Sequence, residues 1–182
     1  MKDVEIRPAV PEDAQAISDL HTRSFRVSYQ YLPETGRSLE TGDERRAEFW
    51  EKLLERHHES TLLAVCDDRM IGFIRFGPSP DDDSDEETGH IFSVHVDPDL
   101  TGSGVGGRLV RAAVSAMSGN HRAATLWALS DNESAHRFYE RLGWRRDGAT
   151  RTEKLSIGHG DGDRVEVIRF HLDLVEMPEG AR

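Results

Sequence analysis

A run of glycines between a strand pattern and a helical pattern is the feature that most constrains this chain. Four glycines fall within six residues: Gly102, Gly104, Gly106 and Gly107. The segment 94–96 before them alternates as a strand does, and Pro98 ends it. From Val105 onward apolar residues recur at helical spacing. Bare backbone at a helix start offers unpaired N–H groups and a partial positive charge, which together favour a bound phosphate.

Three phosphate-binding motifs compete for these glycines. A P-loop ends in Gly-Lys-Ser/Thr, but Arg108 follows Gly107, which excludes it. The dinucleotide motif Gly-x-Gly-x-x-Gly is met literally by Gly102, Gly104 and Gly107, with Asp131 as an acidic ribose contact. Too little chain follows for the two halves of that fold. An NAD-dependent oxidoreductase is therefore the weaker alternative.

The third motif gives a better fit. Residues 101–106, Thr-Gly-Ser-Gly-Val-Gly, resemble the coenzyme A loop of the GNAT family of N-acetyltransferases, Arg/Gln-x-x-Gly-x-Gly/Ala. Thr101 replaces the usual Arg or Gln, so we expect weaker diphosphate binding. A second family motif, Asn-x-x-Ala-x-x-Phe-Tyr-x-x-x-Gly-Phe/Trp, is met later in the chain by Asn132, Ala135, Phe138, Tyr139, Gly143 and Trp144. Two independent motifs in the family's order carry the resemblance over residues 89–144.

The resemblance implies an α/β (α+β) fold, with a mixed, mostly antiparallel sheet of about seven strands, splayed near its middle and flanked by about four helices. Strands are expected at residues 4–7, 61–66, 70–76, 89–96, 123–129, 151–157 and 165–174. Helices are expected from Pro11, over 43–58, after Gly104 and from Asp131 or Asn132. We expect one domain over residues 1–182, with the acidic segment 78–87 as a solvated, mobile loop.

Composition restricts the partners of the chain. A net charge of −11 disfavours nucleic acid, because a basic surface supplies most of the affinity for phosphates, and it favours a cationic amine. No run approaches the roughly 20 apolar residues of a membrane span, and the first residues lack a signal-peptide core, so a cytoplasmic protein is expected. No metal is assigned, because neither His-Glu-x-x-His nor Cys-x-x-Cys occurs. Cys66, the only cysteine, is expected to be buried packing.

The resemblance implies acetyl transfer from acetyl-CoA to a primary amine of a small molecule, peptide or protein, in a ternary complex; family members often form homodimers. The loop is expected to hold the cofactor diphosphate through Thr101, Gly102, Ser103, Gly104, Val105, Gly106 and Gly107. The pantetheine arm is expected beside the backbone of Val94, His95 and Val96, with the Val94 N–H donating to the thioester oxyanion. Asn132 is expected to orient the cofactor, although helix capping explains it equally well.

Two side chains are the candidates for proton transfer. An ammonium with a pKa of about 10.4 is only roughly one part in a thousand neutral at pH 7, so a base is useful. The resemblance implies His90 as this base, because it stands where many relatives have a glutamate, with Glu87 as a weaker alternative. The resemblance implies Tyr139, which stands at the position of the family's general acid, as the acid for the departing thiolate. That transfer is uphill by roughly 2 kcal/mol in water, so a lowered tyrosine pKa or an apolar site is needed. The alternatives to these catalytic roles are that His90 is only a surface residue and that Tyr139 is only a core residue.

The sequence leaves the acceptor and one functional alternative open. Phe25, Tyr29, Tyr31 and Leu32 are equally candidates for an acceptor pocket and for the core. An antibiotic, an amino acid, a polyamine, a peptide N-terminus and a lysine all remain open as acceptors. The alternative to an enzyme is an acetyl-CoA-binding regulatory module without turnover.

Overall fold

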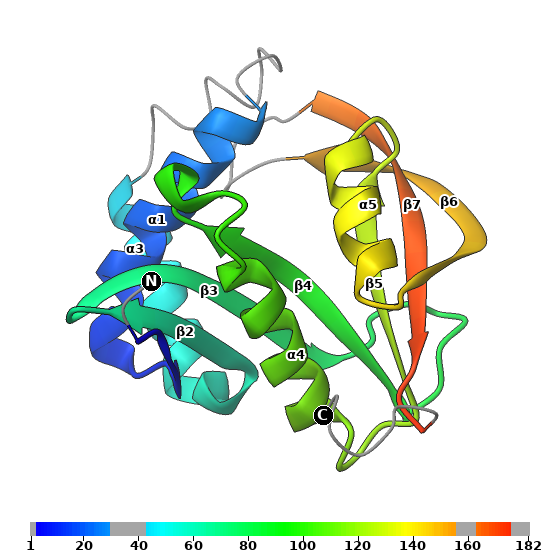
Figure 1. Cartoon of the computed structure of the whole chain (residues 1–182), viewed down its shortest axis with the longest axis horizontal. Coiled ribbons are helices and arrows are strands. Elements are labelled where there is room, and N and C mark those ends of the chain that lie inside the picture. Colours follow the sequence, from blue (N-terminus) through cyan, green and yellow to red (C-terminus); the bar gives the residue numbers. More distant parts are fainter. Residues whose placement is uncertain (1–2, 30–42, 156–162, 176–182) are drawn as a thin grey trace.

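The computed structural model describes residues 3–29, 43–155 and 163–175, which form a seven-stranded sheet with helices on both faces (Figure 1). The strand order is β1-β2-β3-β4-β5-β7-β6. Only β4 and β5 pair in parallel; every other neighbouring pair is antiparallel. The mixed, mostly antiparallel sheet predicted above is confirmed. The strands are β1 (Glu5–Pro8), β2 (Thr61–Cys66), β3 (Arg69–Pro78), β4 (Thr88–Val96), β5 (Ala123–Leu129), β6 (Arg145–Leu155) and β7 (Asp163–Asp173).

Four α-helices of the described residues cover the two faces of the sheet (Figure 1). On one face, α1 and α3 pack over β2 and β3, where Ile17, Leu20 and Trp50 surround Leu63 and Phe73. On the other face, α4 lies over β3 and β4, and α5 lies near β5 and β7. The helices are α1 (Ala14–Tyr29), α3 (Asp43–His57), α4 (Val105–Met117) and α5 (Glu133–Arg141).

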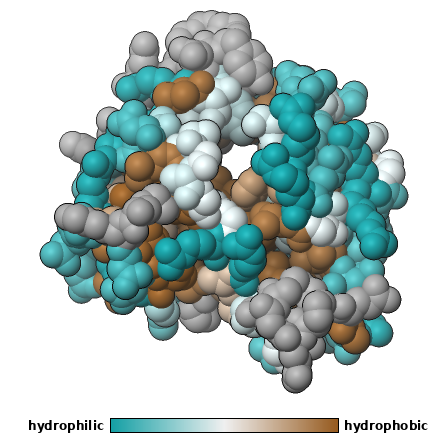
Figure 2. Space-filling view, viewed as in Figure 1, coloured by the Kyte–Doolittle hydropathy of each residue, from teal (hydrophilic) through white to brown (hydrophobic). Residues whose placement is uncertain are grey.

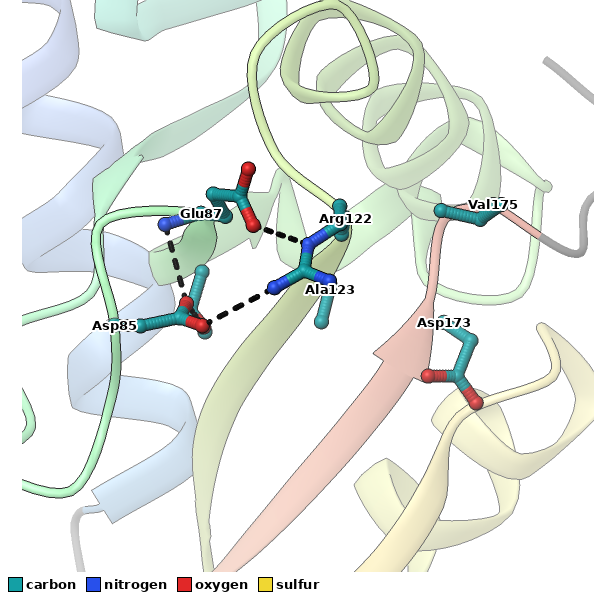
Figure 3. Close-up of a pocket in the computed structure, with 7 residues that line it drawn as sticks. Asp85, Glu87, Arg122, Ala123, Asp173 and Val175 are labelled. Atoms are coloured by element: carbon teal, nitrogen blue, oxygen red, sulfur yellow. Dashed lines mark hydrogen bonds and ion pairs between the residues drawn. The ribbon is translucent and has the colours of Figure 1, made fainter.

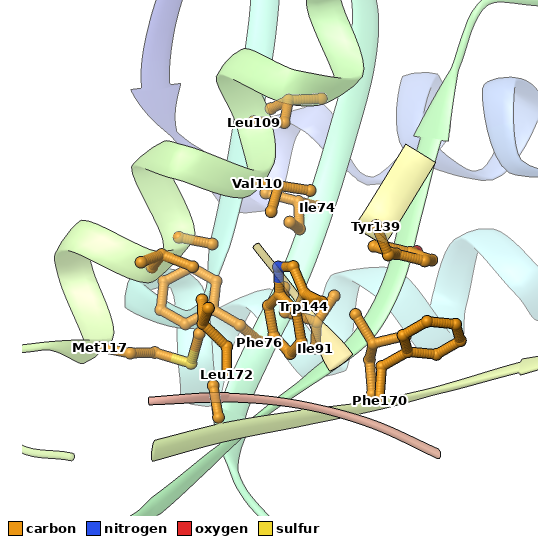
Figure 4. Close-up of a cluster of buried hydrophobic side chains, with 14 of the residues drawn as sticks. Ile74, Phe76, Ile91, Leu109, Val110, Met117, Tyr139, Trp144, Phe170 and Leu172 are labelled. Carbon is orange, nitrogen blue, oxygen red and sulfur yellow. The ribbon is translucent and has the colours of Figure 1, made fainter. Parts of the chain in front are cut away.

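The larger core lies beneath α4 and α5 (Figure 4). Leu109 and Met117 of α4 pack in one buried cluster with Ile74, Trp144 and Phe170. Full burial of a side chain of this size contributes roughly 1.5–3 kcal/mol. The cluster therefore fixes α4, and with it the loop that precedes α4, against the sheet.

The sheet splits between β4 and β5. Their parallel pairing runs only from Thr88↔Ala123 to Ile91↔Leu126. Beyond that point β4 continues to Val96 beside β3, while β5 continues beside β7. Phe92 is an extra residue in β4, because Arg75 pairs with Ser93 and the next pair is Phe76↔Ile91. The predicted splay is thus present, and a bulge marks where it begins.

One predicted strand was too short. β6 begins at Arg145, before the predicted start at residue 151, and pairs along β7 from Arg145↔His171 to Leu155↔Asp163. Most of its residues are exposed, so its sequence lacks the alternation that identifies a half-buried strand. The predicted end at residue 157 lies outside the described residues.

Candidate active site

The glycine loop leads directly into α4, as predicted. Gly104 caps the helix with a φ of 90°, and Gly102 has a φ of 81°. Both conformations are left-handed, which glycine adopts without strain and other residues rarely do. Buried Asp97, at the end of β4, holds the entry to the loop through ion pairs with Arg69 and Arg23.

The start of α4 offers its backbone to a ligand. Within the described chain, no carbonyl accepts from the N–H groups of Val105, Gly106 and Gly107; the first such bond runs from Arg108 N to Gly104 O, at 3.2 Å. A Cβ added at Gly102 or Gly104 would meet no atom within 4 Å, so the loop is open above these glycines. Free N–H groups at a helix N-terminus bind anions such as phosphate.

Two side chains complete this anion site. The hydroxyl of Ser103 is buried with no hydrogen-bond partner among the described residues, and a buried polar atom needs one. The guanidinium of Arg111 comes within 3.6 Å of a Cβ built on Gly107, so a cation stands over the first turn. The prediction that Ser103 binds the cofactor stays a prediction; Arg111 was not among the predicted residues, although its place one turn after Gly107 in the sequence puts it on the same helix face.

At Gly106 the first turn of α4 packs between α5 and β4. A Cβ there would lie 3.4 Å from the Phe138 ring of α5 and 3.5 Å from Val96 of β4. Thr101, at the start of the glycine loop, is exposed. Asn132 caps α5, since its side-chain oxygen accepts from Ala135 N at 3.0 Å, so the capping alternative is confirmed for this side chain. A role toward the cofactor stays a prediction.

The free edge of β4 begins where β5 departs. Val94 pairs with Ile74 and Val96 with Gly72 on the β3 side, and neither pairs with β5. Both valine side chains pack toward the α4 core. Figure 2 shows a hollow between the loop before α4 and helix α5, beside this edge. Past the gap, Leu155 of β6 packs against Phe25 and Tyr29 of α1.

His95 points to the other face of the sheet. Its ring stacks on Phe73 at a centroid distance of 5.1 Å, and its Nδ1 lies 2.7 Å from Ser24 Oγ. Burial, together with neighbouring His21, holds the pKa of His95 well below its usual value. The His95 side chain therefore faces away from the α4 side of the gap, and a role of its backbone toward the cofactor stays a prediction.

Tyr139 of α5 faces the α4 side of the sheet, in contact with Trp144 and Phe170 (Figure 4). It also contacts Phe138, the residue before it. Burial raises the pKa of Tyr139 well above its ordinary value, and the nearby Tyr29 adds to the effect. The acid role was expected to need either a lowered tyrosine pKa or an apolar site, and the lowered pKa is contradicted. The apolar site is present. Phe25 is buried and Tyr29 half-buried, while Tyr31 and Leu32 lie outside the described residues.

His90 is a buried residue, not an exposed strand end, with only 4% of its surface accessible. Its Nδ1 lies 2.8 Å from Thr125 Oγ1, which donates to Gly89 O at 3.4 Å. This arrangement favours a proton on Nδ1 and a lone pair on Nε2. Burial lowers the pKa of His90 to about 4, partly opposed by Asp81, so the imidazole is neutral at physiological pH.

The acidic segment 78–87 is tied to the sheet, and the prediction of a wholly solvated loop was wrong. Asp81 is buried and accepts from Trp127 Nε1 at 3.1 Å and from Arg151 Nη1 at 2.7 Å. Burial alone would raise the pKa of Asp81, but these hydrogen bonds outweigh it and the pKa is lowered. Asp83 binds Arg169 through two hydrogen bonds of 2.6 and 2.7 Å.

Glu87, the weaker base candidate, lies at the closed end of the sheet. It pairs with Arg122, which also contacts Asp85 at 3.5 Å (Figure 3). A surface pocket of about 370 Å³ opens there, lined by Asp85, Glu87, Thr88, Arg122, Ala123, Asp173 and Val175. Thr88 and Val96 are the two ends of β4, roughly 26 Å apart at about 3.3 Å per residue. This pocket is therefore remote from the glycine loop.

The described residues contain no group of three or more His, Cys, Asp or Glu side chains placed to hold a metal ion. None of the described helices is both long and apolar enough to cross a membrane. Cys66 is half-buried and not in a disulfide, so it is less enclosed than predicted.

Comparison with known proteins fits this geometry. The family model described as Acetyltransferase (GNAT) family matches residues 15–144. A mycothiol acetyltransferase of Kocuria rhizophila is 33% identical over 155 residues, which cover 79% of this chain and 46% of that protein. The spermine/spermidine N(1)-acetyltransferase of Bacillus subtilis is 23% identical, with 80% of this chain and 90% of that protein covered. This chain thus spans less than half of the mycothiol relative.

Solved structures share the fold. The crystal structure of PaiA N-acetyltransferase from Thermoplasma acidophilum, in complex with coenzyme A, has a TM-score of 0.71 at 16% identity and covers 94% of this chain and 99% of that one. The residues that the family model matches include both sequence motifs and strands β4 and β5, which separate after Ile91 and Leu126. The chain therefore belongs to the GNAT family of acetyltransferases.

Proposed function

We propose that this protein transfers an acetyl group from acetyl-CoA to a primary amine by direct attack in a ternary complex. The observation that carries the proposal is the free backbone at the start of α4 beside the free edge of β4. An anion site and an open strand edge, side by side, match a ligand with a diphosphate at one end and an amide-bearing arm at the other.

The residues that would hold the cofactor fall into two groups. The N–H groups of 105–107, the Ser103 hydroxyl and the Arg111 guanidinium would bind the diphosphate. The edge of β4 from Val94 to Val96 would pair with the pantetheine arm as an added strand does. The Val94 N–H would donate to the oxyanion that forms as the amine attacks the thioester carbon.

Proton transfer would be divided between the two faces of the sheet. On the cofactor side, the Tyr139 hydroxyl would donate to the departing thiolate; an apolar site destabilises the thiolate and so favours its protonation. On the other side, Nε2 of His90 would accept a hydrogen bond from the amine or from a water that carries its proton onward. With a pKa of about 4, His90 would accept a hydrogen bond from the amine or the water but would not keep the proton, which would pass on to solvent.

One set of observations favours the second candidate, a regulatory acetyl-CoA-binding module. His90 is almost inaccessible, and the raised pKa of Tyr139 makes its proton harder to release. The first test is calorimetric titration with acetyl-CoA, followed by thiol release with a panel of primary amines. Tight binding with transfer to any amine supports the enzyme; tight binding with no transfer supports the module. Absence of binding contradicts both.

A further inference from the structure

Arg75 of β3 stands at the mouth of the gap between β4 and β5. It pairs with Ser93, whereas the last β4 residue paired with β5 is Ile91. Its neighbour Ile74 packs into the α4 core, so the Arg75 side chain faces the opposite side of the sheet. There its guanidinium lies 4.1 Å from the centre of the Phe92 ring. Phe92 is the bulge residue and is 37% exposed.

Arg75 differs from the other arginines on this face. Arg169 pairs with Asp83 and Asp147, and Arg151 pairs with Asp81. No carboxylate of the described residues lies within ion-pair distance of Arg75, which is only partly exposed. Burial lowers the pKa of Arg75 below its usual value, with no nearby carboxylate to raise it. A partly buried cation without a counter-charge is unfavourable, unless a ligand supplies the counter-charge.

The contact with Phe92 leaves the guanidinium suited to one kind of ligand. Cation–π contact uses the face of the group, so the N–H donors around its edge stay available. That planar fork matches a carboxylate, which accepts two parallel hydrogen bonds. His90 lies beside the same ring, 4.9 Å from Phe92 between centroids. Arg75 and His90 therefore flank one exposed aromatic surface.

We propose that Arg75 binds a carboxylate of the acceptor, so that the preferred acceptors are amines that also carry a carboxylate, such as amino acids. The inference rests on the proposed function, since it assigns the acceptor to this face of the sheet. It also separates this protein from the polyamine acetyltransferase it resembles, because a polycation would bring like charge to Arg75.

The test compares acids with their neutral partners. Wild-type protein and Arg75→Met are assayed for thiol release with a panel of amino acids and with the matching amino acid amides. Methionine keeps the apolar contact with Phe92 and removes the fork. We expect Arg75→Met to raise KM for the acids about 10- to 100-fold, the usual effect of losing charged hydrogen bonds, and to leave the amides unchanged. Arg56→Met, an exposed arginine of α3, is the control for loss of one charge.

Calorimetry separates this inference from the proposed transfer. The same acids are titrated into each protein saturated with coenzyme A, after thermal melting has shown that Arg75→Met is folded. Binding that is lost only in Arg75→Met, without acetyl transfer, supports the carboxylate site and contradicts the enzyme. Equal use of acids and amides by the wild type, an equal loss with both in Arg75→Met, or no binding of any acid overturns the carboxylate site.

Discussion

Tyr139 and His90 lie on opposite faces of the central sheet. Tyr139 packs in the cluster beneath α4 and α5, whereas His90 bonds to Thr125 on the other face. The gap where β4 and β5 separate connects the two faces. A nucleophile from one side and a leaving group on the other would each meet one proton-transfer group.

Replacing Tyr139 with phenylalanine removes a hydroxyl and little packing. We expect kcat to fall roughly 100- to 10,000-fold, the usual contribution of a positioned acid, with the Kd for acetyl-CoA unchanged. Thiol release measures the first and calorimetry the second. Unchanged turnover would make Tyr139 a core residue only.

The pH dependence of turnover reports the state of His90. Because its pKa is about 4, His90 stays neutral above that pH, and the small neutral fraction of the amine then sets the pH dependence near neutrality. We expect kcat/KM for the amine to rise about tenfold per pH unit from pH 6 toward the amine pKa. An inflection near 6.5 would mean that His90 titrates as a solvent-exposed histidine does.

Gly104 and Gly148 give a matched pair of glycine variants. Their φ angles are 90° and 93°, and neither would have a Cβ neighbour within 4 Å. Alanine at either site should cost about 1–2 kcal/mol of unfolding free energy through backbone strain. Only Gly104→Ala alters the cofactor loop, so it alone should weaken acetyl-CoA binding in calorimetry. Equal affinity of the two variants would contradict the site.

His90 also makes the fold sensitive to acid. Its folded pKa of about 4 is below the unfolded value of 6.5, so its stabilising effect is complete above pH 6.5 and is lost as pH falls through 4. At the acid limit this loss is about 3 kcal/mol. Urea unfolding of His90→Gln from pH 7 to 4 should show a smaller decline than the wild type.

His57→Gln is the control for that series, because His57 is exposed at the end of α3. It should leave the acid decline as in the wild type. His21 and His95 contribute in the same direction, since burial lowers the pKa of both. A decline identical in His90→Gln and wild type would show that His90 adds nothing to the acid sensitivity, which would then come from His21, His95 and carboxylates with lowered pKa values such as Asp81.

The glycine loop was predictable because its signal is local. The glycines at positions 102 and 104 indicate left-handed backbone, and the helical spacing of apolar residues after them predicts a helix. Asp81 was not predictable, because its burial depends on Arg151 and Arg169, far along the chain. A carboxylate in an acidic run looks solvated until its partners are known.

Arg75 was missed for a related reason. A single arginine in an apolar strand belongs to no sequence motif and forms no periodic pattern of polar residues. Its place follows from the register of β3 on β4, which the bulge at Phe92 shifts. The pKa of Tyr139 likewise depends on how tightly the helices and sheet enclose it, which the motif does not encode.

The bulge has a consequence for how this protein responds to mutation. An extra residue in one strand leaves a main-chain group that neither neighbouring strand uses, here next to the free edge at Val94. Contacts made by peptide groups survive most replacements of the side chain. Alanine scanning of 92–96 would therefore under-report the importance of this stretch, whereas proline at Val94, which deletes the amide hydrogen itself, would expose it.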